Sequence, residues 1–250
     1  MQFPEIPAKA VVFDYGNTLM LSPFEDVLKL KKAEFQKELA NRGYKFRGEE
    51  IICAWITADE EVNYIHISHF GQEEPIILEA LKKLGIQSHL AELSRKFLEI
   101  YRRGYAELSR MNPRRIEIKE ILEHLKNKGK KLGIFSDGRK FDLSLVLGIW
   151  EISEYFDFAI ASEEIGFEKP HENVSKIIIQ KTGLLAEDIA YVGDNPIRDG
   201  FSKEAGMKFI LYFPPQEYRK SVPWRRYTAN GGPKPDAIIG NLLDLKNIIT

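Results

Sequence analysis

The sequence predicts an α/β protein: a doubly wound parallel sheet with a helical subdomain inserted after the first strand. After Pro113, short apolar runs alternate with stretches of helical periodicity, which is typical of a parallel sheet covered by helices on both faces. From about residue 24 to residue 110 the pattern is helical, without a convincing strand. We therefore assign residues 1–20 and 111–250 to a core domain and residues 21–110 to a helical cap-like insertion.

The first predicted strand spans residues 10–14 (A-V-V-F-D). Its continuous apolar run is typical of a strand buried on both faces of a sheet. The run ends at Y-G-N-T (residues 15–18), a turn-forming sequence. Asp14 is therefore the last residue of this predicted strand, at its carboxyl end.

The inserted segment has the periodicity of long amphipathic helices. Apolar side chains recur there at helical spacing, and glycines fall where helices would end. The apolar positions are Leu90, Leu93, Phe97, Ile100 and Tyr101, and the glycines are Gly43, Gly71 and Gly85.

The second half of the chain completes the predicted sheet. A helix ending near Gly129 precedes the second strand, another helix follows Pro170, and a third runs to Gly206. The later strands are predicted at residues 131–135, 158–161, 189–192, 208–212 and 237–239.

Composition narrows the functional classes. The 250 residues carry 36 Lys plus Arg against 37 Asp plus Glu, so no global field attracts nucleic acid or a membrane surface. The single cysteine, Cys53, excludes an internal disulfide and favours a reducing cytoplasm. No signal peptide and no apolar run near the roughly 18 residues of a membrane span are found. We expect a soluble cytoplasmic protein.

Polar residues gather at the predicted strand ends, where ligands bind in sheets of this kind. They follow the first, second and fourth strands and precede one helix. They are Asp14, the run Ser136, Asp137 and Gly138, then Asp194, and before the helix Lys169.

This set of groups suits a phosphoryl group beside a divalent cation. Asp14 and Asp194 could share Mg²⁺, which prefers hard oxygen ligands, and the cation would offset repulsion between a carboxylate and a phosphate. Ser136 and the amides around Gly138 can donate hydrogen bonds to phosphoryl oxygens. Lys169 adds a compact positive charge. A further acid, Asp199, could support the metal from outside its ligand shell.

Four segments resemble the four motifs of the haloacid dehalogenase-like superfamily. Each alone is weak evidence, but together they are specific, and in order and spacing the resemblance extends over the whole chain. They are F-D-Y-G-N-T-L at 13–19, G-I-F-S-D-G at 133–138, G-F-E-K-P at 166–170 and Y-V-G-D-N-P-I-R-D at 191–199.

The resemblance implies a Rossmann-like core with a helical cap inserted after the first motif, and a set of site roles. Asp14 would be the nucleophile that forms an aspartyl-phosphate, with a small phosphorylated metabolite as substrate. The phosphate-binding set would be Ser136, Asp137, Gly138 and Lys169, with Lys169 also stabilising the reacting group. The Mg²⁺ set would be Asp14, the main-chain carbonyl of Gly16, Asp194 and, in support, Asp199.

The sequence departs from the family pattern at Gly16. Phosphatases of this family usually carry a second Asp two residues after the nucleophile, which acts as general acid and base. Glycine cannot protonate a leaving group, and general acid catalysis is worth about 10²- to 10⁴-fold in rate. Our main interpretation is a phosphatase for good leaving groups, such as sugar-1-phosphates, acyl phosphates or aryl phosphates.

Three alternatives remain open from the sequence. A water or a cap residue could replace the acid and leave an ordinary substrate range. The protein could instead bind phosphorylated ligands or regulate a partner with little turnover. A 2-haloacid dehalogenase is less favoured, because those enzymes need no metal and lack the fourth motif in the form Gly193-Asp194 with Asp199.

Two further features are interpreted structurally. Residues 218–227 (Y-R-K-S-V-P-W-R-R-Y) mix aromatic and basic side chains as single-strand nucleic-acid sites do, but a loop packed on the core or on another subunit is the preferred interpretation. His66 and His69 share a helix face near Glu61, and we interpret them as surface or core residues instead of metal ligands. Whether the protein is a monomer or a homodimer is left open.

Overall fold

The computed structural model describes residues 4–20, 24–64, 73–213 and 231–250. The chain forms two compact units, one made of Met1–Ser22 with Asn112–Thr250 and the other of Pro23–Met111. The first, the core unit, contains the sheet, and the second, the helical unit, is inserted between the first strand and the helix that precedes the second strand. Residues 218–227, His66, His69 and Gly71 lie outside the described residues.

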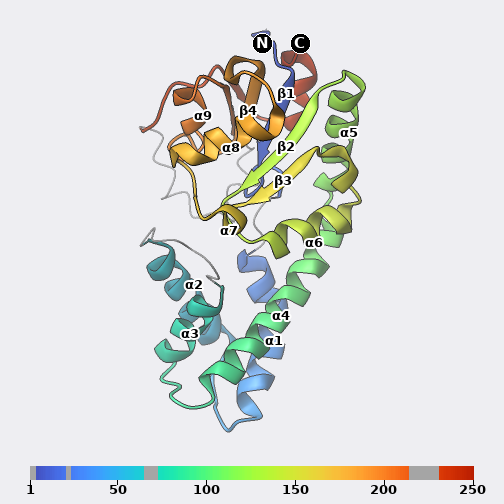
Figure 1. The fold of residues 1–250 in the computed structure, drawn as a ribbon. Helices are drawn as coiled ribbons and strands as arrows, with labels where there is room; N and C mark the ends of the chain where they lie inside the picture. The colour runs from blue at the N-terminus through green and yellow to red at the C-terminus, as the bar shows by residue number, and fades with distance from the viewer. Residues whose placement is uncertain (1–3, 21–23, 65–72, 214–230) are drawn as a thin grey trace. The chain divides into compact units, whose positions relative to one another are not determined.

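The core unit is built on a parallel sheet. Within the described residues it has six strands in the order β3-β2-β1-β4-β5-β6. Figure 1 labels the first four of them, β1 to β4. Every neighbouring pair is parallel, with Ala10 opposite both Lys131 and Ile189. The strands are β1 (Ala10–Asp14), β2 (Lys131–Ser136), β3 (Phe158–Ala161), β4 (Ile189–Gly193), β5 (Lys208–Tyr212) and β6 (Ala237–Ile239). The central position of β1 places Asp14 in the middle of the sheet edge.

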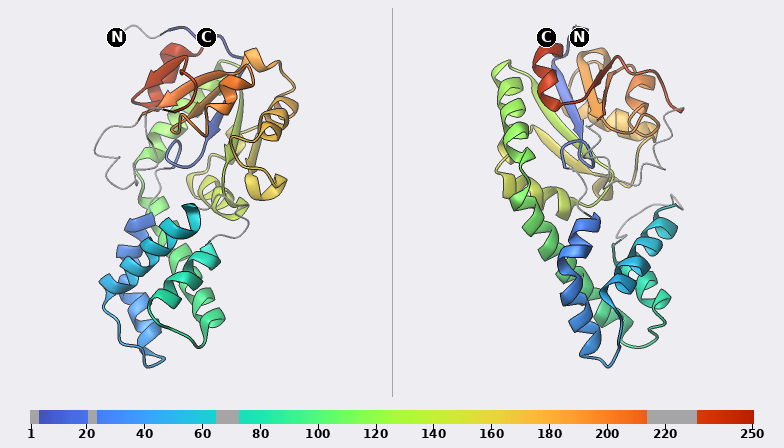
Figure 2. Two further views of the ribbon diagram at one scale, coloured as in Figure 1. Left: turned by 90° about the vertical axis from the view of Figure 1, so that its left-hand side faces the viewer. Right: turned by 180° about the vertical axis from the view of Figure 1, so that it is seen from behind.

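Helices cover both faces of this sheet. One face carries α5 (Arg114–Asn127) and α6 (Lys140–Trp150), and the other carries α8 (Glu172–Thr182) and α9 (Phe201–Glu204) (Figures 1 and 2). Strands β1 and β4 are buried along their whole length, because each is covered on both sides. Shorter pieces are η1 (Ser153–Tyr155), α7 (Ser162–Ile165), η2 (Ala186–Asp188), η4 (Leu242–Asp244) and α11 (Leu245–Ile248).

The side chains between the sheet and α8 explain why the strands sit where they do. Val12 of β1 and Tyr191 of β4 pack with Val174 and Ile178 of α8 in one apolar cluster. Tyr191 also meets Phe201 of α9 edge to face, with ring centroids 5.1 Å apart. These contacts anchor β1 and β4 against α8 and α9.

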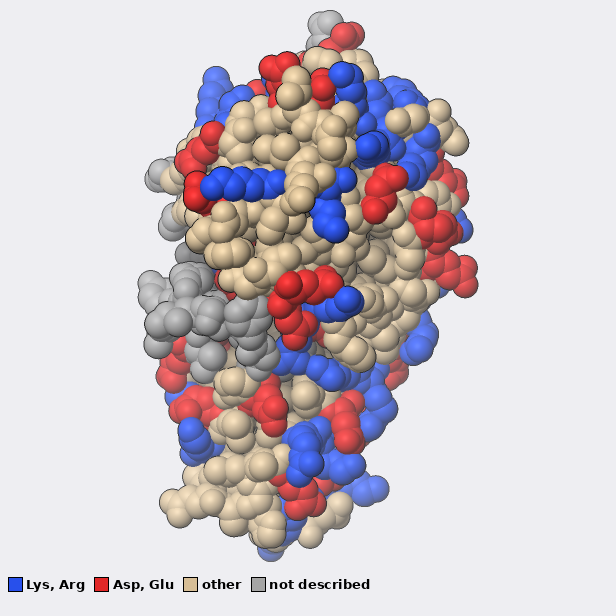
Figure 3. Space-filling view, viewed as in Figure 1, with Lys and Arg blue, Asp and Glu red and all other residues tan. Residues whose placement is uncertain are grey.

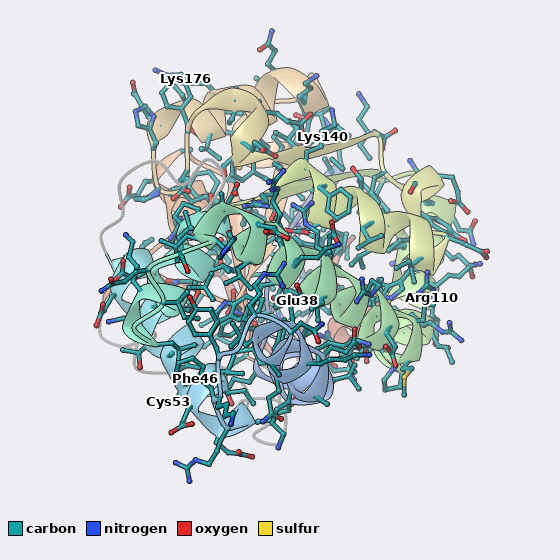
Figure 4. The ribbon with its side chains drawn as sticks, turned by 90° about the horizontal axis from the view of Figure 1, so that it is seen from below. Glu38, Phe46, Cys53, Arg110, Lys140 and Lys176 are labelled. Atoms are coloured by element: carbon teal, nitrogen blue, oxygen red, sulfur yellow. The ribbon has the colours of Figure 1, made fainter. Side chains whose placement is uncertain are left out.

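The helical unit has its own hydrophobic core. Its helices are α1 (Phe24–Ala40), α2 (Gly48–Tyr64), α3 (Glu73–Lys83) and α4 (Leu90–Met111). At the centre, the ring of Phe35 lies 5.2 Å from that of Trp55 and 4.8 Å from that of Phe97. Figure 4 shows this unit with its side chains, including Cys53, which is exposed on α2. The buried residues of this core all belong to the helical unit.

The predicted fold class is confirmed, since a parallel sheet with helices on both faces carries a helical insertion after its first strand. On the face shown in Figure 3, Lys and Arg side chains are interspersed with Asp and Glu, as the balanced composition suggests. None of the helices in the described part of the chain is both long enough and apolar enough to cross a membrane.

Candidate active site

The strand register brings the predicted site residues to one edge of the sheet. Asp14 pairs with Phe135 of β2, so Ser136 lies one step further along. Phe13 pairs with Val192 of β4, so Asp194 lies just beyond the strand end. Asp14, Ser136, Lys169, Asp194 and Asp199 are all buried, with relative exposures of 6% or less. A buried group of charged side chains is unusual unless the charges serve one another or a ligand.

Lys169 lies at the centre of this group. Its Nζ is 2.6 Å from Asp14 Oδ1 and 2.6 Å from Asp199 Oδ1. The same ammonium is 5.7 Å from the centre of the Tyr191 ring. Lys169 therefore links Asp14 at the end of β1 to Asp199 in the loop after β4, although the three residues are far apart in the sequence.

Three carboxylates form a set that fits a hard divalent cation. Asp14, Asp194 and Asp199 each offer an oxygen, and these oxygens lie within 4.8 Å of one another. Oxygen donors of this kind suit Mg²⁺, which keeps several waters and takes few protein ligands. The three carboxylates together carry more negative charge than Lys169 can offset, which favours a bound cation.

For both Asp14 and Lys169, burial and the neighbouring charges have opposing effects on the pKa. Burial raises the pKa of Asp14 to about 7, against the lowering influence of the neighbouring Lys169. Burial acts to lower the pKa of Lys169, but Asp14 and Asp199 outweigh it and raise that pKa well above its usual value. Lys169 therefore stays positively charged, whereas burial disfavours the charged form of Asp14.

Local hydrogen bonds hold the carboxylates in place. Thr18 Oγ1 donates to Asp14 Oδ2 over 3.1 Å, within the turn that follows β1. The backbone N–H of Asn195 donates to Asp199 Oδ2 over 2.9 Å. Gly16 lies in the same turn as Thr18 and forms a bridge with Met20. Thr18 was quoted in the first motif but given no role there, and its hydroxyl contact with Asp14 becomes visible only in the fold.

Two residues of the predicted phosphate-binding set make bonds within the protein. The Gly138 N–H donates to Ser162 Oγ over 3.0 Å. Asp137 Oδ1 accepts the backbone N–H of Lys169 over 2.9 Å, and its Oδ2 lies 2.8 Å from Arg198 Nη2. The geometry thus connects Asp137 with the loop before α8 and with the loop after β4.

Sequence reasoning missed Arg198. This residue was part of the fourth motif as quoted, immediately before Asp199, but nothing in the sequence indicates which carboxylate an arginine will meet. In the fold its guanidinium contacts both Asp137 and Glu168. Its position one residue from a predicted site residue is the one signal that could have drawn attention to it.

Several known proteins are similar to this chain in sequence or in fold. The family model of haloacid dehalogenase-like hydrolases matches residues 69–212. The chain is 30% identical to the glyceraldehyde 3-phosphate phosphatase of Methanocaldococcus jannaschii over 205 residues, which cover 80% of this chain and 82% of that protein. It is 24% identical to the phosphoglycolate phosphatase of Yersinia pestis, with 75% of this chain and 73% of that protein covered.

Solved structures agree on the fold. The 2-haloacid dehalogenase of Pseudomonas syringae pv. Tomato DC3000 superposes with a TM-score of 0.64 at 22% identity, over 95% of this chain and 96% of that one. At this identity the likeness concerns the fold alone. The family match over more than half of the chain, together with the relative at 30% identity, shows that this chain belongs to the haloacid dehalogenase-like hydrolase family.

Proposed function

We propose that the protein is a Mg²⁺-dependent phosphatase that acts on a small phosphorylated metabolite through an aspartyl-phosphate at Asp14. The observation that carries the proposal is the position of Asp14 at the end of the central strand, 2.6 Å from Lys169 and within reach of two further buried carboxylates. The named phosphatases among its relatives support the same reaction class.

In the proposed mechanism, Asp14 is the nucleophile. A bond forms between an Asp14 carboxylate oxygen and phosphorus, while the bond from phosphorus to the leaving-group oxygen breaks. Water then hydrolyses the aspartyl-phosphate, which releases inorganic phosphate and returns the carboxylate. Thr18 orients Asp14 by donating to the oxygen that does not contact Lys169.

Lys169 and Ser136 would bind the phosphoryl oxygens. The Lys169 ammonium is held between two carboxylates, so it is positioned before substrate arrives. Ser136 is buried at the end of β2, beside β1 in the sheet, where its hydroxyl can donate to the same group. When bound, Mg²⁺ would offset the repulsion between the Asp14 carboxylate and the anionic substrate. Its proposed ligands are Asp14, Asp194 and the Gly16 carbonyl, with Asp199 in support.

Gly16 shapes the substrate range that we propose. Because glycine cannot protonate the leaving-group oxygen, substrates whose leaving group departs readily as an anion should react best. Acyl phosphates, aryl phosphates and sugar-1-phosphates are of this type. Glyceraldehyde 3-phosphate and phosphoglycolate, which the names of the relatives suggest as substrates, are alkyl esters with poorer leaving groups.

The test is phosphate release from p-nitrophenyl phosphate, acetyl phosphate, glyceraldehyde 3-phosphate and phosphoglycolate, with Mg²⁺ and with EDTA. The proposal expects metal-dependent release with the first two substrates fastest, and no release by Asp14→Asn, which is nearly isosteric. Turnover retained by Asp14→Asn would refute the aspartyl-phosphate step. Absence of turnover with every substrate, in a folded protein that binds phosphate, would favour the ligand-binding alternative.

A further inference from the structure

Arg198 joins three loops that each carry a site residue. Its guanidinium lies 2.8 Å from Asp137 Oδ2 and 3.1 Å from Glu168 Oε2. Asp137 follows Ser136, Glu168 precedes Lys169, and Arg198 itself precedes Asp199. One side chain therefore connects the loop after β2, the loop before α8 and the loop after β4 at positions one residue away from the site.

Asp137 is the partner through which Arg198 affects the site most directly. Asp137 Oδ1 accepts the backbone N–H of Lys169, which fixes where the lysine side chain starts. Asp137 Oδ2 lies 3.8 Å from Lys169 Nζ, close enough to compete with Asp14 and Asp199 for the ammonium. That same oxygen accepts from Arg198 Nε and lies against Arg198 Nη2. Arg198 thus occupies the carboxylate oxygen that would otherwise draw Lys169 away from Asp14.

The charges around Arg198 also indicate that it assists anion binding at the site. Asp137 and Glu168 are two carboxylates beside a site that is to receive an anion. Arg198 neutralises part of this charge, and its planar fork reaches both carboxylates, which the single ammonium of a lysine cannot do in the same way.

We propose that Arg198 is a positioning residue for phosphate binding: by engaging Asp137 and Glu168, it keeps Lys169 directed toward Asp14 and shields the bound phosphate from two carboxylates. This inference rests on the proposed function of the site, but its test does not require turnover. Inorganic phosphate in the presence of Mg²⁺ is the probe, because it binds without chemistry.

The experiment compares Arg198→Met with a matched control elsewhere in the core unit. Lys126 lies 2.9 Å from Asp157 Oδ2, and Asp157 also accepts a backbone N–H, that of Leu132 near the start of β2. The Lys126→Met variant removes the same kind of contact at the opposite end of the strand. Phosphate affinity is measured by calorimetry, and KM and kcat for p-nitrophenyl phosphate are measured where the wild type turns over.

We expect Arg198→Met to weaken phosphate binding by about 10- to 100-fold, as the loss of groups that orient site residues commonly does, with KM rising in parallel. Lys126→Met should bind phosphate as the wild type does. Asp137→Asn in the Arg198→Met background should recover much of the affinity, because asparagine keeps the acceptor for Lys169 N–H and removes the competing charge. A purely structural role for Arg198 would give no such recovery.

The possible outcomes distinguish the positioning role of Arg198 from the proposed phosphatase activity. If Arg198→Met binds phosphate within about twofold of the wild type, or if Asp137→Asn restores nothing, the positioning role is wrong. If Arg198→Met does not fold, Arg198→Lys replaces it, and wild-type phosphate affinity in that variant overturns the inference. Loss of phosphate binding by Arg198→Met in a protein whose wild type shows no turnover supports the inference and counts against the phosphatase proposal alone.

Discussion

The turn after Asp14 has room for a side chain that the sequence does not supply. A Cβ built on Gly16 would meet no heavy atom within 4 Å, and the backbone there is not in the left-handed region that favours glycine. Neither crowding nor backbone strain therefore explains the glycine. A single substitution at Gly16 could therefore place a carboxylate two residues after Asp14.

Gly16→Asp should accelerate reactions with poor leaving groups more than those with good ones. A carboxylic acid at this position can protonate an alkoxide as it leaves, and we expect a gain of about 10²-fold with glyceraldehyde 3-phosphate. The gain with p-nitrophenyl phosphate should be much smaller, because that leaving group needs no proton. Gly16→Asn is the control for size. Equal gains with both substrates would contradict the view that the absent acid limits the substrate range.

Asp14→Asn should stabilise the metal-free protein, and more so as pH rises. Burial raises the pKa of Asp14 from 3.8 to about 7. Between these values the unfolded chain loses this proton while the folded state keeps it, so stability falls as pH rises and the loss is complete above about pH 7. A shift of this size corresponds to at most about 4 kcal/mol.

Urea denaturation in EDTA measures this effect. The free energy of unfolding of Asp14→Asn should exceed that of the wild type, and the difference should be larger at about pH 8 than at about pH 5. A difference that stays constant or shrinks over this range would show that the Asp14 carboxyl ionises as easily in the folded protein as in the unfolded chain.

The sequence predicted which side chains lie together at the strand ends, but not all of their contacts. Asp14, Lys169, Asp194 and Asp199 meet because strand ends converge at one edge, which the alternation of strands and helices already implies. The pairing of Arg198 with Asp137 depends on how two loops approach each other. Loop approach has no periodicity in the sequence, so such contacts could not be predicted.

At the scale of elements, the strands were the most predictable part. Strands β1, β3, β5 and β6 have the bounds read from their apolar runs, and β2 and β4 each extend one residue further. For β1 and β4, continuous burial on both faces makes the apolar run distinct from its surroundings. The helix predicted to run to Gly206 is present as the short α9, and the residues just before it form turns, in which the backbone N–H of Asn195 donates to Asp199 Oδ2.

Unlike Gly16, Gly193 at the end of β4 has no room for a side chain. A Cβ on Gly193 would overlap the Asp199 carboxylate. Gly193→Ala should therefore displace Asp199 and weaken Mg²⁺ binding by about 10- to 100-fold. Gly148→Ala in α6 is the control, because its Cβ would meet nothing within 4 Å. Calorimetric titration with Mg²⁺ measures the effect, and equal affinities in the two variants would disprove it.

At the scale of the whole molecule, the two units have separate cores and only one contains the carboxylate set. Mg²⁺ should therefore slow amide hydrogen exchange in β1 and β4 while leaving the central turns of α1 and α4 nearly unchanged. Exchange measured by mass spectrometry with Mg²⁺ and with EDTA tests this expectation, and Asp194→Asn should remove the protection. Equal protection in both units would contradict it.

The position of the insertion also has a consequence for biosynthesis. Ala10 of β1 pairs with Lys131 and Ile189, and the whole helical unit is translated before either partner emerges from the ribosome. The helical unit, whose contacts are local in sequence, can fold while β1 is still an unpaired apolar strand. Asp14 is thus among the first residues synthesised, yet its surroundings are completed only after β4 has left the exit tunnel.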